Sequence, residues 1–217
     1  MARLFNRNFI VGVTGSIAAY KAAELTRSLI REGANVRVIM TEGACEFITP
    51  LTLQALSGHE VHTDLLDTEA EAAMGHIELA RWADALLIAP ASADSIARLV
   101  QGRADDLLGA CALATPAPVF VAPAMNQEMW AKQATQDNVQ TLVSRGIAML
   151  GPSSGSQACG DVGVGRLLEP DDIVSAVAEH LSTGALSGRH VVITAGPTRE
   201  PVSYTHLRAH ETLRYLV

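Results

Sequence analysis

The chain has 217 residues, of which 48% are hydrophobic, 4% aromatic and 18% charged, and its mean hydropathy is +0.20. This composition excludes a disordered chain, and the length suits one α/β domain alone or with a fragment of a second. The net charge of −7, without a Lys/Arg-dense stretch, disfavours nucleic acid as a partner, and no apolar run is long enough to span a membrane.

The first forty residues predict a right-handed βαβ unit. A β-branched run over residues 9–14 ends at Gly15-Ser16, and a helical pattern over residues 17–31 follows. Gly33 ends that helix, and residues 35–40 read as the next strand. A strand, a glycine turn, a helix and a strand within about thirty residues are typical of parallel pairing.

The same alternation continues along the chain. Further strands are predicted at residues 85–89, 119–122 and, more weakly, 147–150. Further helices are predicted at residues 47–56, 95–100, 106–113, 127–145 and 171–181. The pattern predicts an α/β fold, a doubly wound, mostly parallel sheet with helices on both faces.

Two segments interrupt the pattern. Residues 151–165 are rich in glycine and serine, and a loop of this length is usually functional or mobile. The small residues of 182–189 predict a linker after a domain over residues 1–181. Residues 190–201 then look like the first strand and turn of a second α/β domain, which too few residues follow to complete.

Four predicted strand ends share one edge of the sheet, the edge at which ligands bind in such folds. They are Gly15-Ser16, Thr41-Glu42, Pro90–Ser95 and Pro123–Asn126. Gly15-Ser16-Ile17 places backbone N–H groups and a hydroxyl at a helix N-terminus, which suits a phosphate, although the spacing is not the dinucleotide fingerprint. Taken singly, the turns are explained better as helix caps by Ser16 and by Asp94 or Ser95, and Asn126 too could simply cap the following helix.

Histidine and cysteine supply the remaining candidates. His76 suits acid/base work, or is a helix-start histidine bonded to nearby backbone. Cys159 lies in the glycine-rich segment and is a candidate reactive thiol, whereas Cys45 and Cys111 are expected to be packing residues. The pair His59 and His62 lacks further ligands, so we expect surface residues and no metal site. An odd number of cysteines without C-x-x-C spacing favours a reducing cytoplasm.

Five motifs, in order, carry a resemblance to a known family. They are residues 15–21 (GSIAAYK), 75–79 (GHIEL), 89–94 (APASAD), 123–130 (PAMNQEMW) and 155–161 (GSQACGD). On these motifs the chain resembles the homo-oligomeric flavin-containing cysteine decarboxylases over about residues 8–201. It is most similar to the phosphopantothenoylcysteine decarboxylase domains that precede a phosphopantothenate–cysteine ligase domain in bifunctional chains. The segment 123–130 is the most specific of the five.

The resemblance implies FMN as cofactor, and it assigns the site residue by residue. The cofactor-binding positions are Gly15, Ser16, Ile17, Thr41, Ser92, Ala93, Asp94, Ser95 and Ala124. The substrate-binding positions are Asn126, which would hold the substrate carboxylate, and Met125, Ser156, Gln157 and Ala158. His76 would be the acid/base residue and Cys159 the proton donor of the final reduction. Asp94 stands where many relatives carry Asn.

The implied activity is FMN-dependent decarboxylation of 4′-phosphopantothenoylcysteine to 4′-phosphopantetheine, a carboxy-lyase step of coenzyme A biosynthesis. The resemblance also implies a homotrimer, or a dodecamer built from trimers, with the flavin at subunit contacts. Residues 202–217 match neither the ligase domain nor the decarboxylase, so ligase activity is not expected from this chain. A flavin prenyltransferase, a phosphatase-binding regulatory subunit and a peptidyl-cysteine decarboxylase are the competing interpretations.

Overall fold

The centre of the protein is a parallel sheet of six strands. The computed structural model describes residues 2–65 and 75–182 of the chain. The strand order is β3-β2-β1-β4-β5-β6, and every neighbouring pair is parallel. The strands are β1 (Asn8–Val13), β2 (Asn35–Met40), β3 (Val61–His62), β4 (Ala85–Ala91), β5 (Val119–Pro123) and β6 (Ala148–Met149). The predicted fold class is confirmed.

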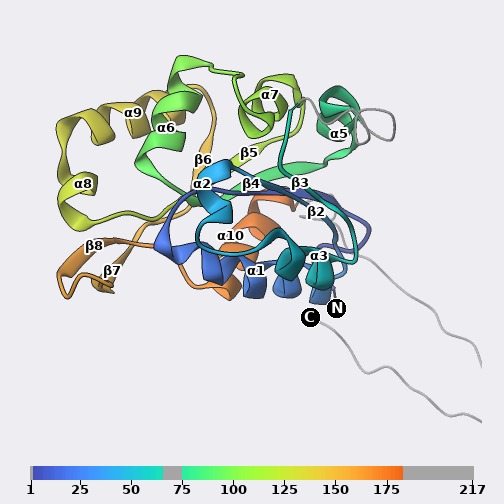
Figure 1. Ribbon diagram of the computed structural model, residues 1–217, viewed down its shortest axis with the longest axis horizontal. Helices are drawn as coiled ribbons and strands as arrows, with labels where there is room; N and C mark the ends of the chain where they lie inside the picture. Colours follow the sequence, from blue (N-terminus) through green and yellow to red (C-terminus); the bar gives the residue numbers. More distant parts are fainter. Residues whose placement is uncertain (1, 66–74, 183–217) are drawn as a thin grey trace, which may run out of the picture. The chain divides into compact units, whose positions relative to one another are not determined.

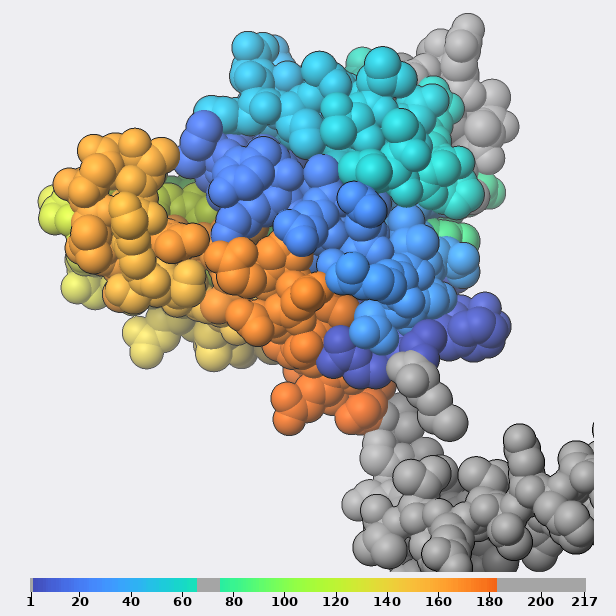
Figure 2. Space-filling view, turned by 90° about the horizontal axis from the view of Figure 1, so that it is seen from below, coloured from blue at the N-terminus to red at the C-terminus, as the bar shows by residue number. Residues whose placement is uncertain are grey.

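Helices cover both faces of this sheet, as Figure 1 shows, with α1, α3 and α10 on one face and α5, α6, α7 and α9 on the other. The bounds are η1 (Ile17–Tyr20), α1 (Lys21–Arg31), α2 (Glu42–Cys45), α3 (Pro50–Ser57), α5 (His76–Trp82), α6 (Ala93–Gln101), α7 (Leu107–Ala114), α8 (Gln127–Ala131), α9 (Gln133–Ser144) and α10 (Pro170–Leu181). The space-filling view in Figure 2 looks onto the α1, α3 and α10 face.

The sheet divides the buried apolar side chains into two cores, because successive residues of a strand point to opposite faces. In β4, Leu87 and Ala89 pack into the core beneath α1, α3 and α10. Leu86 and Ile88 pack into the core beneath α5, α6, α7 and α9. All seven residues of β4 are buried, which explains why its sequence is a continuous apolar run instead of an alternating one.

The prediction of one continuous helix over residues 127–145 is wrong. The segment forms two helices, α8 and α9, because Lys132 adopts an extended conformation with φ −63° and ψ 136°. Helix α8 contacts β8, whereas α9 contacts α6, so tertiary packing directs the two helices differently. The Gln136 side-chain amide donates to the Trp130 carbonyl and satisfies one of the carbonyl groups at this break.

The predicted long loop over residues 151–165 is also wrong, since most of it is an antiparallel hairpin. Its strands are β7 (Ser153–Ser156) and β8 (Val162–Arg166). Glycine and serine give these strands no apolar alternation, which is the signal that predicts a strand. Gly165 has φ +142°, and a Cβ there would lie 2.3 Å from the Met125 carbonyl oxygen. Only glycine allows β8 to approach the end of β5 so closely.

The predicted domain bounds beyond residue 182 fall outside the described residues. These are most of the linker, the start of a second domain at 190–201 and the tail at 202–217. Residues up to Leu181 form one compact unit. Within residues 2–65 and 75–182, no helix combines the length and the apolar character needed to cross a membrane.

The central position of β1 predicts that two chemically identical substitutions lower the free energy of unfolding by very different amounts. Val11 is fully buried in β1, whereas the Val143 side chain on α9 is 53% exposed. Val11→Ala should lower the free energy of unfolding by about 2 kcal/mol, from lost burial and the cavity left behind. Val143→Ala should change it by less than about 0.5 kcal/mol. Urea unfolding of both variants measures this, and equal losses would contradict the assignment of β1 to the core.

Candidate functional site

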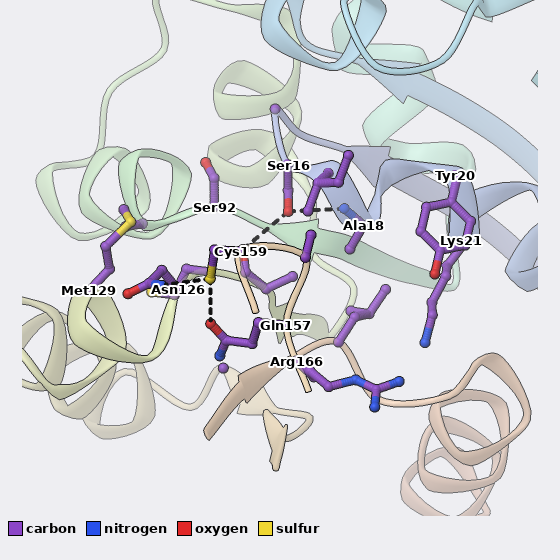
Figure 3. Close-up of a pocket in the computed structure, with 18 of the residues that line it drawn as sticks. Ser16, Ala18, Tyr20, Lys21, Ser92, Asn126, Met129, Gln157, Cys159 and Arg166 are labelled. Carbon is purple, nitrogen blue, oxygen red and sulfur yellow. Dashed lines mark hydrogen bonds between the residues drawn. The ribbon is translucent and has the colours of Figure 1, made fainter. Parts of the chain in front are cut away.

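A cavity of about 610 Å³ opens where β1, β4 and β5 end. Its lining residues come from η1 and the start of α1, from the turn after β4, from the junction of β5 with α8, and from the hairpin (Figure 3). The cavity therefore gathers three of the four strand ends that the sequence predicted at this edge, and Thr41-Glu42, after β2, does not line it. The hairpin, which the sequence did not predict, supplies another wall.

Thr14 ties the ends of β1 and β4 together. Its buried hydroxyl donates to the Pro90 carbonyl at 2.7 Å and accepts from the Ser92 backbone N–H at 2.9 Å. A second link joins β1 to β5, because the Ser16 hydroxyl donates to the Ala124 carbonyl at 3.3 Å. Sequence reasoning missed Thr14, although the signal was there: a hydroxyl residue ends an otherwise apolar run.

The predicted helix caps Ser16 and Asn126 are confirmed, whereas the predicted cap of α6 is wrong. Ser16 caps η1 by accepting from the Ala18 N–H, and Asn126 caps α8 by accepting from the Glu128 N–H. The cap of α6 is Ser92, not Asp94 or Ser95. Ser92 accepts from the Ser95 N–H at 3.2 Å because it is the last extended residue before the helix.

Most predicted site residues line the cavity. Those that do are Gly15, Ser16, Ile17, Ser92, Ala93, Ala124, Met125, Asn126, Ser156, Gln157, Ala158 and Cys159. Thr41, Asp94, Ser95 and His76 do not line it. The sequence predicted no role for the lining residues Tyr20, Met129 and Arg166, which only the folded chain brings to the cavity.

The four predicted residues that do not line the cavity lie near it in sequence or contact other residues of the fold. Thr41 precedes α2, and Ser95 is buried with its hydroxyl 3.0 Å from that of Ser92. Asp94 is exposed and forms an ion pair with Arg98, with 2.8 Å between Oδ2 and Nε. His76 is the first residue of α5, where its carbonyl accepts from the Cys111 thiol at 3.6 Å.

Three polar side chains, Asn126, Cys159 and Asp161, meet beside one end of the cavity, and Figure 3 shows the first two, which line it. The Asn126 amide nitrogen donates to the Cys159 sulfur at 3.3 Å and to Asp161 Oδ2 at 3.1 Å. The Cys159 thiol in turn donates to Asp161 Oδ2 at 3.3 Å. The sequence predicted functions for Asn126 and Cys159 separately, and the structure brings them into direct contact.

The hairpin is held against the β5–α8 junction by backbone and amide hydrogen bonds. The Met125 N–H donates to the Gly165 carbonyl at 2.9 Å, and the Gln127 N–H donates to Gln157 Oε1 at 3.0 Å. The turn that carries Cys159 is closed by a 2.8 Å bond from the Gln157 N–H to the Asp161 carbonyl. These contacts hold the hairpin and both ends of the turn that carries Cys159 in place.

A basic pair occupies a different part of the cavity wall. The Lys21 ammonium lies 2.8 Å from Glu169 Oε1, and an Arg166 guanidinium nitrogen lies 3.3 Å from the same oxygen. Figure 3 shows Lys21 and Arg166 on the opposite side of the view from Asn126 and Met129. The cavity therefore has a sulfur- and amide-bearing end and a cationic end.

The three cysteines differ as the sequence predicted. Cys111 is buried, and burial raises the pKa of its thiol to about 12. Burial also raises the pKa of the half-buried Cys45 thiol. Cys159 is exposed and lines the cavity, so it is the cysteine that a ligand meets. Among residues 2–65 and 75–182, no group of three His, Cys, Asp or Glu side chains is arranged to hold a metal ion.

The cavity fits a flat ligand that carries a phosphate. Gly15, Ala18, Ala93 and Ala124 give its walls small side chains. A Cβ on Gly15 would lie 3.2 Å from the Gly43 backbone, so the turn is as narrow as glycine allows. The N-termini of η1 and α6 both face this edge, each with a serine cap, and the N-terminal end of a helix favours an anion.

Comparison with known proteins gives consistent matches. Residues 3–182 match the family model described as Flavoprotein. The chain is 57% identical over 206 residues to the "Coenzyme A biosynthesis bifunctional protein CoaBC" of Haemophilus influenzae, which covers 93% of this chain and 52% of that protein. It is 56% identical over 200 residues to the protein of that name from Escherichia coli K12, covering 92% and 49%. The chain thus spans about half the length of these relatives.

Solved structures give the same picture. A "PPC decarboxylase" mutant complexed with pantothenoylaminoethenethiol matches with a TM-score of 0.72 and 33% identity, covering 82% of this chain and all of that one. "The FMN binding protein AtHal3" matches with a TM-score of 0.71 and 34% identity, covering 83% and 99%. The peptidyl-cysteine decarboxylase EpiD, at 19% identity and a TM-score of 0.69, shares the fold.

Proposed function

Because the chain belongs to the Flavoprotein family, we propose that it is an FMN-dependent decarboxylase. Its substrate would be 4′-phosphopantothenoylcysteine and its product 4′-phosphopantetheine, in the cytoplasmic synthesis of coenzyme A. The observation that carries this proposal is the contact of Asn126 with Cys159 in the cavity. The amide is a ligand for a carboxylate, and the thiol beside it is a proton donor. The proposal concerns decarboxylation alone.

FMN would bind at the edge formed by the ends of β1, β4 and β5. The N–H groups and hydroxyls after Gly15 and around Ser92 would hold its phosphate, and Ala93 and Ala124 leave room for a flat ring. Ser95 and Thr14 would support the Ser92 turn from behind. When bound, the flavin supplies a two-electron acceptor for the substrate thiol and later returns the two electrons.

The cavity residues would then act on the substrate directly. A cysteine carboxyl group leaves as CO₂ only if the electron pair left behind is delocalised, and an oxidised thiol, a thioaldehyde, provides that delocalisation. Asn126 would hold the carboxylate in place beside Met125 and the hairpin residues Ser156, Gln157 and Ala158. Cys159 would donate the proton that completes the saturated product.

The known relatives support this proposal. The matched PPC decarboxylase structure contains pantothenoylaminoethenethiol, an enethiol, whose carbon–carbon double bond beside the sulfur-bearing carbon is what loss of CO₂ from a thioaldehyde produces. A second relative of similar identity is described as an FMN binding protein. Both align over about four fifths of this chain.

His76 would be the acid/base residue, and its position supports a homo-oligomer. It lies at the start of α5, outside the cavity of its own chain. If the flavin lies at a subunit contact, as expected for a trimer or a dodecamer of trimers, the cavity of one chain takes His76 from a neighbouring copy. The exposed Ile77 and Leu113 on α5 and on the contacting helix α7 suit such a contact.

Substitution of Cys159 tests the proton-donor role. Cys159→Ser should still release CO₂ but should accumulate the oxidised enethiol, because a hydroxyl is a far weaker acid than a thiol. Mass spectrometry of the products measures the ratio of enethiol to 4′-phosphopantetheine, which should rise by at least tenfold. Cys45→Ser, a matched substitution outside the cavity, should leave the ratio unchanged. Normal production of 4′-phosphopantetheine by Cys159→Ser would contradict the assignment.

Substitution of His76 tests its acid/base role and which subunit supplies it to the cavity. His76→Asn should lower CO₂ release by at least a hundredfold, the usual contribution of a positioned acid/base group. The exposed His59→Asn is the control. Co-expression of His76→Asn with Cys159→Ser subunits should restore product formation, since one contact then combines an intact His76 with an intact Cys159. No recovery in oligomers shown to be mixed would place both residues in one chain's site.

A further inference from the structure

Asp161 connects two groups of the candidate active site without lining the cavity itself. Its Oδ2 accepts one hydrogen bond from Asn126 Nδ2 at 3.1 Å and another from the Cys159 thiol at 3.3 Å. A single carboxylate oxygen therefore holds both the amide that would bind the substrate carboxylate and the thiol that would donate a proton.

Backbone hydrogen bonds hold Asp161 and Cys159 in one closed turn. The Gln157 N–H donates to the Asp161 carbonyl at 2.8 Å, and the Gly160 N–H donates to the Gln157 carbonyl at 3.0 Å. Gly160 has φ +93°, a conformation that glycine adopts at low cost. Whatever positions the Asp161 carboxylate therefore also positions the Cys159 sulfur.

The orientation of the Asn126 amide is fixed from the other side. Asn126 Oδ1 accepts from the Glu128 N–H at 2.8 Å as the cap of α8. The two N–H groups of the amide are thereby left to face Cys159 and Asp161, and both are in use. A substrate carboxylate on Asn126 needs the same donors, and two carboxylates at one amide repel each other. Asp161 and the substrate carboxylate therefore exclude each other at Asn126.

We propose that Asp161 replaces the substrate carboxylate on Asn126 once CO₂ has left, and that this exchange positions the Cys159 thiol for proton transfer. The proposal rests on the proposed decarboxylation. In that step the bond from the α-carbon to the carboxyl carbon breaks, CO₂ leaves, and the electron pair remains on the substrate as an enethiolate.

The freed Asn126 amide then binds Asp161, which brings the thiol against the substrate. The Cys159 thiol then gives its proton to the α-carbon of the enethiolate, which becomes a thioaldehyde, and the Cys159 thiolate recovers a proton from water. Bound reduced FMN would supply the hydride that converts this thioaldehyde into the product thiolate. Asp161 is a positioning residue. Because it binds Asn126 only after CO₂ has left, Cys159 protonates the substrate α-carbon only after decarboxylation.

The affinity for ligands with and without a carboxylate distinguishes the proposed exchange at Asn126 from a merely structural role of Asp161. Asp161→Asn keeps the shape and removes the competing charge. Calorimetry with FMN-loaded protein would compare 4′-phosphopantothenoylserine, which keeps the carboxylate but has a hydroxyl for the thiol, with 4′-phosphopantetheine, which lacks the carboxylate. The variant should bind the serine compound roughly threefold to tenfold more tightly and 4′-phosphopantetheine no more tightly. Glu128→Gln, which removes an exposed charge from neighbouring α8, should bind both like the parent chain.

Product analysis supplies the second readout. Asp161→Asn should release CO₂ at close to the parent rate while the fraction of enethiol product rises at least fivefold, since only the protonation step loses its positioning. Equal changes in affinity for both ligands, or an unchanged enethiol fraction, would overturn the proposal. A parent chain that binds FMN but releases no CO₂ would instead overturn the proposed function, and the role of Asp161 with it.

Discussion

The hydrogen bonds that join the ends of β1, β4 and β5 are the constraint on which the site depends. Thr14 bonds to both sides of the Pro90–Ser92 turn, and Ser16 bonds to Ala124. The central strands are buried on both faces, so their backbone positions are fixed by two cores at once. That rigidity lets three separate turns present N–H groups and hydroxyls toward one ligand. Binding sites on strand ends gain precision from such a support.

The hairpin adds the chemistry that the sheet edge lacks. The sheet edge offers caps and small residues, which suit a phosphate and a flat ring, whereas the thiol and its carboxylate partner come from the turn between β7 and β8. Glycine permits this docking, since a side chain on Gly165 would collide with the Met125 carbonyl and one on Gly163 would collide with Gln127. The glycine content of this segment thus reflects close contact with α8 and β5.

The sequence predicted the parallel sheet and its edge because apolar strands and intervening helices have distinct periodicities. It also predicted most lining residues, through Gly15-Ser16, the Ser92 turn, Asn126 and Cys159. The sequence did not predict the hairpin, because strands such as Ser153–Ser156 have no apolar face. It did not predict the helix break at Lys132, because that break arises from the packing of α8 and α9 on different partners. The place of His76 outside the cavity depends on distant parts of the fold, which no local pattern encodes.

The visible absorption spectrum of the purified chain, recorded before and after addition of 4′-phosphopantothenoylcysteine, tests the central claim most directly. We expect a yellow protein with bound FMN that releases one CO₂ per substrate and returns to the oxidised flavin spectrum after turnover. A colourless protein that takes up no FMN would contradict the account at its base. Bound flavin without CO₂ release would contradict the decarboxylase assignment while leaving the flavin site intact.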